Sequence, residues 1–445
     1  KELWKLGVPA KTQHNEVAPA QHELAPIYEG VNQSVDHNQI VMETMKKVAE
    51  RHGLACLLHE KPFAGVNGSG KHNNWSLTAD DGTNLMNPGD TPHENIQFLL
   101  VLACIIKAVD IHADLLRESA SNVGNDHRLG ANEAPPAIIS IFLGEQLEDV
   151  IDQLCDTGEA THSKQGGTLK TGVDILPDFD KDATDRNRTS PFAFTGNRFE
   201  FRAPGSRQSI AGINIVINAI VSETLTEIAD QLDGSKDISK DALELAIKIF
   251  KDHERIIFNG NGYSDEWVAE AEKRGLYNLK TTPDAMPYFV TQKSIDLFTK
   301  QEVFTDVEVK TRGEIMMEDY NNTLHFEMLT MLEMAKQEIL PACLKYTKFV
   351  TDDIASKKAL GLNAPKELEK AQRLTELTED LMTKIDILDA STDVPDVDVY
   401  AVGMYYKDTV LPAMDALRET ADTLETIVAK EYWPFPTYTD LLYLV

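Results

Sequence analysis

Three long segments with helical periodicity fill the end of this 445-residue chain and constrain its fold more than any other feature. They span about 313–357, 365–390 and 398–431. Pro365 falls in a first helical turn, where proline is tolerated, and the polar residues 391–393 interrupt the periodicity before the third segment. Long helices with short connections pack side by side, so residues 313–445 are predicted to form an antiparallel helical bundle.

The preceding residues are organised differently. Residues 1–207 alternate short strand-like segments with clusters of glycine, proline and asparagine, whereas residues 208–312 show mainly helical spacing. A single core seldom serves a chain of this length, so several folding units are expected. The pattern predicts an α+β fold over 1–207, a helical remainder over 208–312 and the bundle over 313–445.

Four elements can be placed in the first of these regions. Alternation of apolar and polar residues predicts strands at Leu54–Leu58 and Arg198–Arg202. Helical spacing predicts helices from about Val31 to His52 and from about His93 to Ser119. The region is therefore expected to mix helices and strands, with polar loops between them.

The charge balance excludes several classes of partner. The chain has 72 acidic and 43 basic residues, which gives a formal net charge of −29. Such a surface repels phosphate backbones and anionic membranes, so no nucleic-acid or membrane partner is expected. Clusters of arginine in so acidic a chain need a specific reason to exist.

Cysteine usage and hydropathy predict a cytoplasmic protein. The four cysteines form no CxxC pair and lie in apolar or helical contexts, which is typical of reduced thiols: Cys56, Cys104, Cys155 and Cys343. The longest apolar stretch, about 96–108, is interrupted by Lys107 and is too short to cross a bilayer. The sequence begins at Lys1 without an initiator methionine or a secretory signal, so we expect the intact protein to have residues upstream.

The segment 15–23 carries two closely spaced carboxylates. Glu16 and Glu23 are flanked by apolar and proline residues, and their separation of seven would place them on opposite faces of a regular strand. A bend or bulge at Pro19-Ala20 would bring them together, and neighbouring carboxylates repel unless a cation lies between them. The pair is a candidate cation site, and two surface glutamates on a loop are the alternative.

Two further segments combine small residues with ionisable groups. Glycines in Asn67–Ser76 allow a ligand to come close to the backbone, and His72 is a candidate metal ligand or hydrogen-bonding group. A turn with a satisfied histidine is the alternative. In Arg128–Pro136, an arginine and Glu133 lie among small residues, as in a mobile flap over a substrate. An exposed loop with an ion pair is the alternative there.

The strand predicted near residue 200 has the clearest physical pattern. Alternation places Arg198, Glu200 and Arg202 on one face and two phenylalanines on the other, where they anchor the strand in a core. A carboxylate between two guanidinium groups stays ionised, and guanidinium groups suit phosphate or carboxylate oxygens. Arg186 and Arg188 add positive charge just upstream. A structural salt-bridge ladder is the alternative.

Together the four segments favour a nucleotide-dependent enzyme that acts on an acidic substrate.

These segments resemble the glutamine synthetase family, in the same order along the chain. The resemblance rests on the paired glutamates of Asn15–Glu23, on Lys61-Pro62 followed by Asn67–His72, on the flap Arg128–Pro135, and on the strand Arg198–Arg202. It continues to the C-terminus, where the helical extension and Glu431–Pro436 resemble the type III branch. The resemblance implies a catalytic domain with an antiparallel half-barrel sheet and helices, followed by a C-terminal bundle of long helices.

The resemblance also implies a reaction. It is the ATP-dependent joining of ammonia to L-glutamate through γ-glutamyl phosphate, which yields glutamine, ADP and phosphate in nitrogen assimilation. Two or three Mg²⁺ or Mn²⁺ ions per site would be the cofactors, with ATP as co-substrate. The implied assembly is a homo-oligomer of stacked rings, a dodecamer by resemblance. A γ-glutamyl–amine ligase and a non-catalytic assembly or regulatory homologue are the alternatives.

Matching motifs imply roles for individual residues. The implied metal ligands are Glu16, Glu23, His72 and Glu200. The implied substrate-binding residues are Asn67, Gly68, Arg128 and Arg202. The implied nucleotide-binding residues are Asn74, Ser76, Arg188 and Arg198. The implied catalytic residues are Arg128, Arg188 and Glu133, of which the glutamate would close over the site and take a proton from ammonium.

The chain departs from the family pattern in several places. Asn74 stands where many relatives carry a second histidine, and the spacing from Arg128 to Glu133 is one residue shorter than the common pattern. The second arginine of the phosphate segment has no clear match beyond Arg188, which leaves that role to Arg186 or to none. The family's N-terminal β-grasp domain and its E-x-E strand, which supplies one ligand to each metal, are not in this sequence. We therefore expect this piece alone to be inactive.

Overall fold

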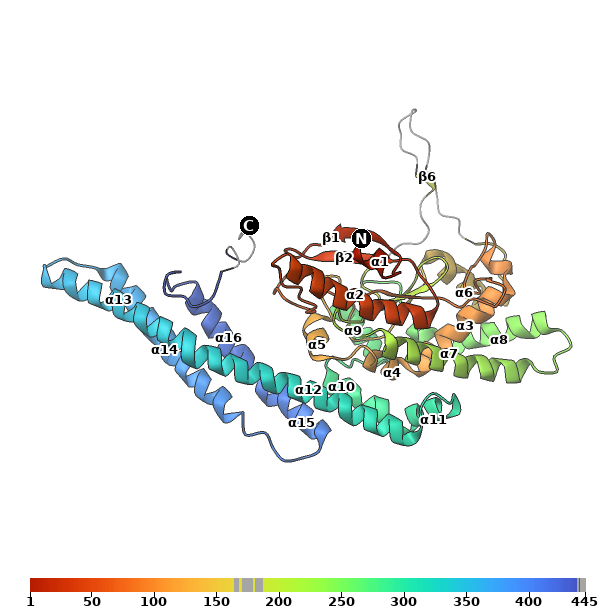
Figure 1. Cartoon of the computed structure of the whole chain (residues 1–445). Helices are drawn as coiled ribbons and strands as arrows, with labels where there is room; N and C mark the ends of the chain where they lie inside the picture. The colour runs from red at the N-terminus through yellow and green to blue at the C-terminus, as the bar shows by residue number, and fades with distance from the viewer. Residues whose placement is uncertain (164–167, 170–178, 181–186, 438–439, 441–445) are drawn as a thin grey trace. The chain divides into compact units, whose positions relative to one another are not determined.

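Two compact units make up the structure, which is a computed structural model. They are unit 1 (Lys1–Thr311) and unit 2 (Arg312–Val445). The cartoon in Figure 1 follows the chain, and the structure describes residues 1–163, 168–169, 179–180, 187–437 and 440. Residues 1–207 and 208–312 do not form separate units, so that finer division stays a prediction.

Unit 1 opens with a short helix and a β-hairpin. Helix α1 (Glu2–Lys5) precedes strands β1 (Ala10–Asn15) and β2 (His22–Pro26), which pair antiparallel. Ala20 in the connecting turn has a φ of 54°, a left-handed conformation that helps to reverse the chain between the strands. Helix α2 (Val31–Arg51) follows where the periodicity predicts a helix.

The central sheet of unit 1 is mixed. Its four strands lie in the order β3 (Asn73–Trp75), β8 (Phe199–Phe201), β7 (Phe192–Phe194) and β4 (Ile141–Phe142). Both pairs that include β8 are antiparallel, whereas β4 and β7 run parallel. A parallel pair needs a crossover connection, and helix α6 (Glu145–Thr157) lies between these two strands along the chain. The expected α+β fold is confirmed, but the sheet is not wholly antiparallel.

Phenylalanines of β7 and β8 form the core beneath this sheet. Phe199 and Phe201 are fully buried, and the ring of Phe192 stacks on that of Phe199 at a centroid distance of 4.7 Å. Glu200 lies between them in sequence and projects from the opposite face, where it is only partly buried. The predicted alternation of this strand is therefore confirmed. Buried aromatic rings fix the strand, so that the carboxylate is held at a defined position.

Three long helices complete the core of unit 1. Helices α3 (Ile96–Ile111) and α7 (Ala211–Leu232) pack against each other, and α8 (Ile238–Asp252) packs against α3. Among the described residues, α7 alone has the length and composition of a membrane span. Half of that stretch is buried inside unit 1, as expected of a helix in a protein core.

The helix predicted from about His93 to Ser119 exists but is broken. A 3₁₀ turn, η1 (Pro92–Glu94), precedes α3, and the chain turns at His112 before α4 (Ala113–Glu118). The remaining elements of unit 1 are α5 (Val123–Arg128), β5 (Thr168–Leu169), β6 (Phe179–Asp180), η2 (Glu254–Ile256), α9 (Asp265–Lys273), α10 (Thr282–Ala285), η3 (Met286–Val290) and α11 (Gln292–Lys300).

The prediction of a strand at Leu54–Leu58 is wrong. These residues belong to no strand of the described structure. Leu54 and Leu57 are 67% and 71% exposed. Alternating apolar residues make a strand only where a neighbouring chain completes the hydrogen-bond ladder, and this segment has none among the described residues.

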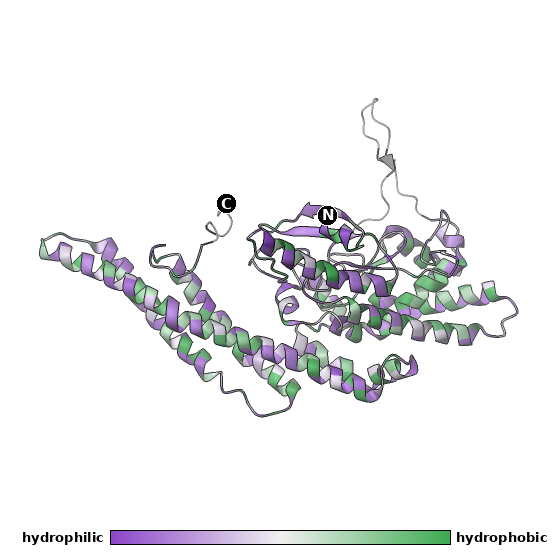
Figure 2. Ribbon diagram, in the orientation of Figure 1, coloured by the Kyte–Doolittle hydropathy of each residue, from purple (hydrophilic) through white to green (hydrophobic). Residues whose placement is uncertain are grey.

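The periodic segments at the end of the chain are helices, as predicted. In order they are α12 (Asp306–Met334), η4 (Ala335–Ile339), α13 (Leu340–Ala359), α14 (Pro365–Ala390), α15 (Val399–Tyr405), η5 (Tyr406–Val410) and α16 (Leu411–Glu425). Figure 2 shows hydrophilic and hydrophobic residues alternating along these helices, as expected when each buries one side against its neighbours. In unit 2, α14 packs against both α13 and α16.

Two wide turns interrupt the helices of unit 2 for the same reason. Both η4 and η5 are single π-helical turns, and each is followed at once by a Leu-Pro-Ala sequence. Pro341 and Pro412 have no N–H, and a proline ring clashes with the preceding turn of an α-helix. A π-turn widens the helix at that point and accommodates the proline without ending the helix.

A buried carboxyl group in unit 1 predicts a dependence of stability on pH. Burial raises the pKa of Glu118 to about 8, with the charge of Arg117 acting in the opposite direction. The folded state therefore binds more protons than the unfolded state between the ordinary pKa and about pH 8, so stability falls as pH rises through this window.

Glu118→Gln is expected to remove this dependence, because the amide does not ionise. Between pH 5 and pH 7, the unfolding free energy of the unmodified chain should fall by about 2 kcal/mol more than that of the variant. Urea unfolding at each pH measures the difference. If the free energy of unfolding changed with pH in the same way for both proteins, the carboxyl group of Glu118 would not be held neutral.

Candidate metal and substrate site

The β-hairpin brings three potential metal ligands together. His14 lies opposite Glu23 in the register of β1 and β2. Its Nε2 atom is 2.5 Å from Oε1 of Glu16 and 2.9 Å from Oε2 of Glu23. One ligand atom from each residue lies within 4.8 Å of the others. The bend predicted between the two glutamates is present, because the hairpin turn brings residues seven apart to the same place.

The pKa values of the two carboxyl groups of this cluster shift in opposite directions. A hydrogen bond from Glu23 lowers the pKa of Glu16. Burial raises the pKa of Glu23, and the hydrogen bond and negative charge of Glu16 raise it further. Hydrogen bonding to Glu16 also raises the pKa of His14. A divalent cation bound between the two carboxylates would neutralise both of them.

A second cluster lies beside the paired strands β3 and β8: His72 directly precedes β3, Glu200 lies in β8, and Arg202 directly follows it. The Nδ1 atom of His72 is 3.1 Å from Oε1 of Glu200, while Arg202 donates to Oε2 from Nε at 2.9 Å and from Nη2 at 2.7 Å. Burial acts to raise the pKa of Glu200, but His72 and Arg202 outweigh it and lower the pKa to about 2. Glu200 is therefore ionised throughout the physiological range.

The two clusters are neighbours. The charge of His72 acts on both Glu16 and Glu23: it adds to the lowering of the pKa of Glu16 and opposes the raising of the pKa of Glu23. The hairpin and the central sheet thus bring all four predicted metal ligands to one region of unit 1. Carboxylate oxygens with an imidazole nitrogen are a donor set that suits Mg²⁺ or Mn²⁺, so the residues present fit such an ion.

The predicted flap is tied to two other predicted site residues. Glu133 accepts a hydrogen bond from Nδ2 of Asn67 at 2.9 Å and from Nη1 of Arg188 at 2.5 Å. Asn132 and Glu133 have φ values of 53° and 67°, a left-handed conformation that non-glycine residues seldom adopt. Such backbone persists only where the surroundings hold it, and here both carboxylate oxygens are bound.

Arg128 and Arg202 are more deeply buried than side chains that bind a substrate from solvent would be. Arg128 is 4% exposed, and its guanidinium donates to the carbonyl oxygens of Arg202, Ala203 and Pro204 and to Oδ1 of Asn125. Arg202 is also buried and donates to Glu200 and to the carbonyl of Asn187. Both arginines brace the walls of the site, and their assignment to substrate stays a prediction.

The other predicted residues lie at the edges of this region. The carbonyl of Gly68 accepts from Nε2 of Gln21 at 3.1 Å, which links the glycine loop to the hairpin. Asn74 is exposed and pairs with Glu200 across the two strands. Ser76 and Arg198 are exposed beside β3 and β8. Arg186 lies outside the described residues.

Two residues of this region were not singled out from the sequence. His14 lies in β1, two residues before Glu16, which directly follows the strand, so extended backbone would place the two side chains on the same face. Tyr263 ends the Asn-Gly-Asn-Gly-Tyr loop in the helical half of unit 1. That loop is fixed beside Arg188, because Asn187 donates to the carbonyl of Gly260 at 2.6 Å. Paired glycines inside a helical region were the available signal.

Tyr263 lies near the flap residue Glu133 and near the two buried arginines. Burial raises the pKa of its phenol, the charge of Glu133 adds to this effect, and the charges of Arg128 and Arg202 oppose it. The hydroxyl group is buried and meets no well-formed hydrogen-bond partner among the described residues, although the backbone of Glu133 lies close to it and acts to lower its pKa.

Tyr263→Phe is therefore expected to change the free energy of unfolding by about 1 kcal/mol or less, because the buried hydroxyl makes at most a weak hydrogen bond. Urea unfolding of the two proteins measures the effect. A loss above this size would mean that the hydroxyl makes a hydrogen bond in solution.

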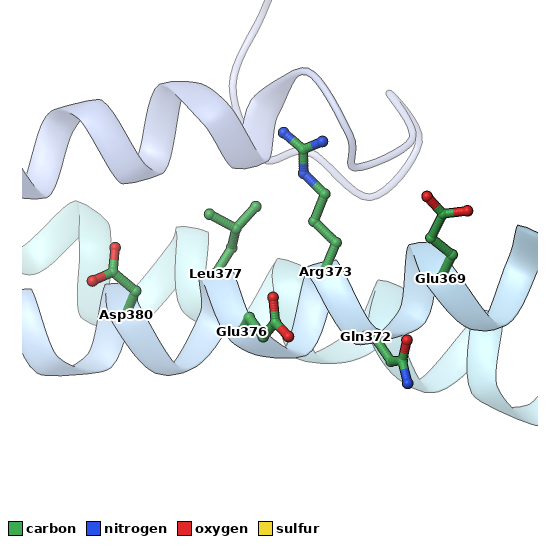
Figure 3. A pocket seen from close by; sticks show the side chains of 6 residues that line it. All are labelled: Glu369, Gln372, Arg373, Glu376, Leu377 and Asp380. Atoms are coloured by element: carbon green, nitrogen blue, oxygen red, sulfur yellow. The ribbon is translucent and has the colours of Figure 1, made fainter.

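A hollow on the surface of unit 2 is not part of this site. It lies along helix α14, and its lining residues are Glu369, Gln372, Arg373, Glu376, Leu377 and Asp380. Figure 3 shows these side chains extending from successive turns of one helix in different directions, without converging on a common point. All predicted site residues belong to unit 1.

Fold and site together are those of an α+β protein with a carboxylate–imidazole centre suited to divalent cations and lined by arginines. Residues 1–125 match the model of the glutamine synthetase catalytic domain, and residues 241–358 match that of the glutamine synthetase C-terminal domain. The chain belongs to the glutamine synthetase family.

Similar proteins cover nearly all of the chain. It is 47% identical to a glutamine synthetase of Butyrivibrio fibrisolvens over 99% of its length, and 43% identical to a type-3 glutamine synthetase of Dictyostelium discoideum over 100%. A glutamine synthetase of Bacteroides fragilis is 40% identical over 99%. The chain spans 64%, 62% and 63% of the length of these three relatives.

Proposed function

We propose that the intact protein catalyses the ATP-dependent ligation of ammonia to L-glutamate through γ-glutamyl phosphate, with glutamine, ADP and phosphate as products. The observation that carries the proposal is the convergence of Glu16, Glu23, His72 and Glu200 beside the flap that carries Glu133. Family membership supports the same reaction.

The four convergent residues would hold the divalent cations. Glu16 and Glu23 of the hairpin form one half of the centre, and His72 with Glu200 the other. Bound Mg²⁺ or Mn²⁺ would neutralise phosphate oxygens, which phosphoryl transfer requires more than covalent help from the protein. The ionised state of Glu200 at neutral pH suits it to this role.

The remaining residues would position substrates and exclude water. Asn67 and Gly68 lie on the loop that contacts the flap, and the substrate L-glutamate is expected to bind beside this loop. Arg202, Arg198 and Arg188 would face carboxylate and phosphate oxygens, with Asn74 and Ser76 on the nucleotide side. Guanidinium groups bind such oxygens in bidentate fashion.

Glu133 combines two tasks in this proposal. Its contacts with Asn67 and Arg188 hold the flap over the site and keep water from an acyl phosphate. Its carboxylate would also take a proton from ammonium, so that neutral ammonia attacks the γ-carbonyl carbon and phosphate leaves. Arg128 acts from beneath, by bracing the backbone that carries Arg202.

The proposal extends to the state of the intact protein. We propose a cytoplasmic homo-oligomer of stacked rings. The relatives are longer than this chain, and in the intact protein the part that corresponds to their additional length would complete the site. This chain alone is then expected to be inactive. Turnover by this chain at the rate of the intact protein would contradict that part of the proposal.

The test of function compares nucleophiles. The intact protein is supplied with ATP, Mg²⁺ and glutamate, together with either ammonia or a polyamine, and the products are separated by mass. Glutamine formed with ammonia supports the proposal. A γ-glutamyl amine formed only with the polyamine would assign the scaffold to an amine ligase, and no ATP-dependent product in either case would indicate a non-catalytic role.

A further inference from the structure

Glu60 is a buried carboxylate that none of the proposed catalytic roles uses. It is fully buried, with 0% of its surface exposed. Its Oε1 atom accepts a hydrogen bond from the backbone N–H of Arg207 at 3.2 Å, and its Oε2 atom has no hydrogen-bond partner among the described residues. A buried carboxylate is costly unless neighbouring charges compensate it.

Three glycines from separate segments make room for this residue. A Cβ atom at Gly124 would overlap Oε2 of Glu60 and lie 2.8 Å from Cδ, and one at Gly205 would lie 2.8 Å from Cγ. A Cβ atom at Gly68 would lie 2.5 Å from the backbone oxygen of Glu60. Because such distances are shorter than any normal Cβ contact, the absence of a side chain at all three positions permits the arrangement.

The compensating charges come from Lys71 and Arg128. Burial lowers the pKa of Lys71 to about 8 and that of Arg128 to about 10, and the negative charge of Glu60 opposes both shifts. Lys71 donates from Nζ to the carbonyls of Ser206, at 2.7 Å, and Gln208. Arg128 lies against Gly70, where a Cβ would overlap its guanidinium. Glu60 thus faces two cations that are themselves bound to the backbone.

Each glycine segment also carries a predicted substrate-site residue. Gly68 follows Asn67, whose amide binds the flap glutamate. Gly124 lies in helix α5, which ends at Arg128. The segment that contains Gly205 follows Arg202, and the backbone N–H of Lys71 donates to the carbonyl of residue 204 at 2.9 Å. Three segments of the site therefore meet at Glu60, two of them at its side chain and the 67–71 loop at its backbone oxygen.

We infer that Glu60 is a positioning residue for the glutamate side of the site. Its carboxylate fixes the 67–71 loop, the start of α5 and the 203–208 segment relative to one another, and its charge holds Arg128 and Lys71 in place. Glu60 touches no reacting group and acts through Asn67 and Arg128. The inference rests on the proposed function only in naming glutamate as the substrate.

The test uses the intact protein with two matched substitutions. Glu60→Gln keeps the shape of the side chain and removes its charge. Glu118→Gln is the control, because Glu118 is also a buried glutamate of unit 1 but lies outside the site and is held neutral. Glu60→Gln is expected to raise the KM for glutamate at least about tenfold, the effect typical of a residue that orients a binding group, and to leave the KM for ATP unchanged. The control should change neither.

Hydrogen exchange provides a readout that does not depend on activity. The reporters are the amides of Ser69, Lys71 and Arg207, which bind Glu60 or the segment beside it. Their exchange should be faster in Glu60→Gln than in the unmodified protein or in the control. Unchanged exchange together with an unchanged KM for glutamate would overturn the inference.

Two further outcomes are decided in the same experiment. If Glu60→Gln does not fold, Glu60→Asp is measured instead; it keeps the charge but withdraws the carboxylate, and unchanged exchange and KM in that variant would overturn the inference. If even the unmodified protein shows no glutamate-dependent turnover, the proposed function fails, and the exchange measurement alone decides whether Glu60 fixes the three segments.

Discussion

Glu200→Ala is expected to lower kcat/KM of the intact protein by about a thousandfold while the protein stays folded. Glu200 is ionised, binds both His72 and Arg202, and lies within the group of predicted metal ligands. Losing one preorganised charged group at a site of phosphoryl transfer typically costs a factor of a hundred to about a thousand, and here the partners lose their orientation too.

The control for this experiment is Glu227→Ala. Glu227 forms an ion pair with Lys107 at 2.8 Å in the same unit, away from the proposed metal ligands. Steady-state turnover and stabilisation of the protein by Mg²⁺ with ATP are measured for both variants. An equal, small loss in the two variants would show that Glu200 is only one member of a structural salt-bridge ladder, the alternative weighed from the sequence.

Arg128→Met is expected to destabilise unit 1 by about 3–5 kcal/mol. The guanidinium satisfies the carbonyl groups of three consecutive residues, Arg202 to Pro204, and compensates the buried charge of Glu60. Methionine fills much of the same space as arginine but has no hydrogen-bond donor and no charge. Breaking a buried charge pair by removing one partner has an effect of this order.

Arg274→Met provides the comparison for Arg128. Arg274 also donates to a backbone carbonyl, that of Ile257, and pairs with Glu270, but it is more exposed. Its loss is expected to cost about 1 kcal/mol. Urea unfolding followed by tryptophan fluorescence reports on unit 1 through the buried Trp75 and Trp267. Similar losses for the two arginines would mean that Arg128 is not bound as the structure describes.

Local patterns were sufficient to predict the elements that carry the site. The alternation around Glu200 and the carboxylate pair Glu16 and Glu23 depend only on neighbouring residues, and both led to the observed placement. The long helices of unit 2 followed from periodicity in the same way. Such features need no knowledge of distant contacts.

Features that depend on distant partners were not predicted. The parallel pairing of β4 with β7 and the missing ladder at Leu54–Leu58 are set by which chain lies alongside, which periodicity does not encode. From the sequence alone, the glycines around Lys71 predict room for a ligand. In the structure, Gly68 and Gly70 make room for Glu60 and Arg128 of the chain itself. Long-range packing of this kind appears only in three dimensions.

Oxygen transfer from glutamate to phosphate tests the proposed reaction most directly. The intact protein is supplied with Mg²⁺, ATP, ammonia and glutamate labelled with ¹⁸O in the γ-carboxylate. If the γ-carboxylate attacks ATP and ammonia then displaces phosphate, each inorganic phosphate released carries one labelled oxygen, and one glutamine forms with it. Phosphate without the label, released alongside glutamine or without it, would contradict the γ-glutamyl phosphate route and with it the central proposal.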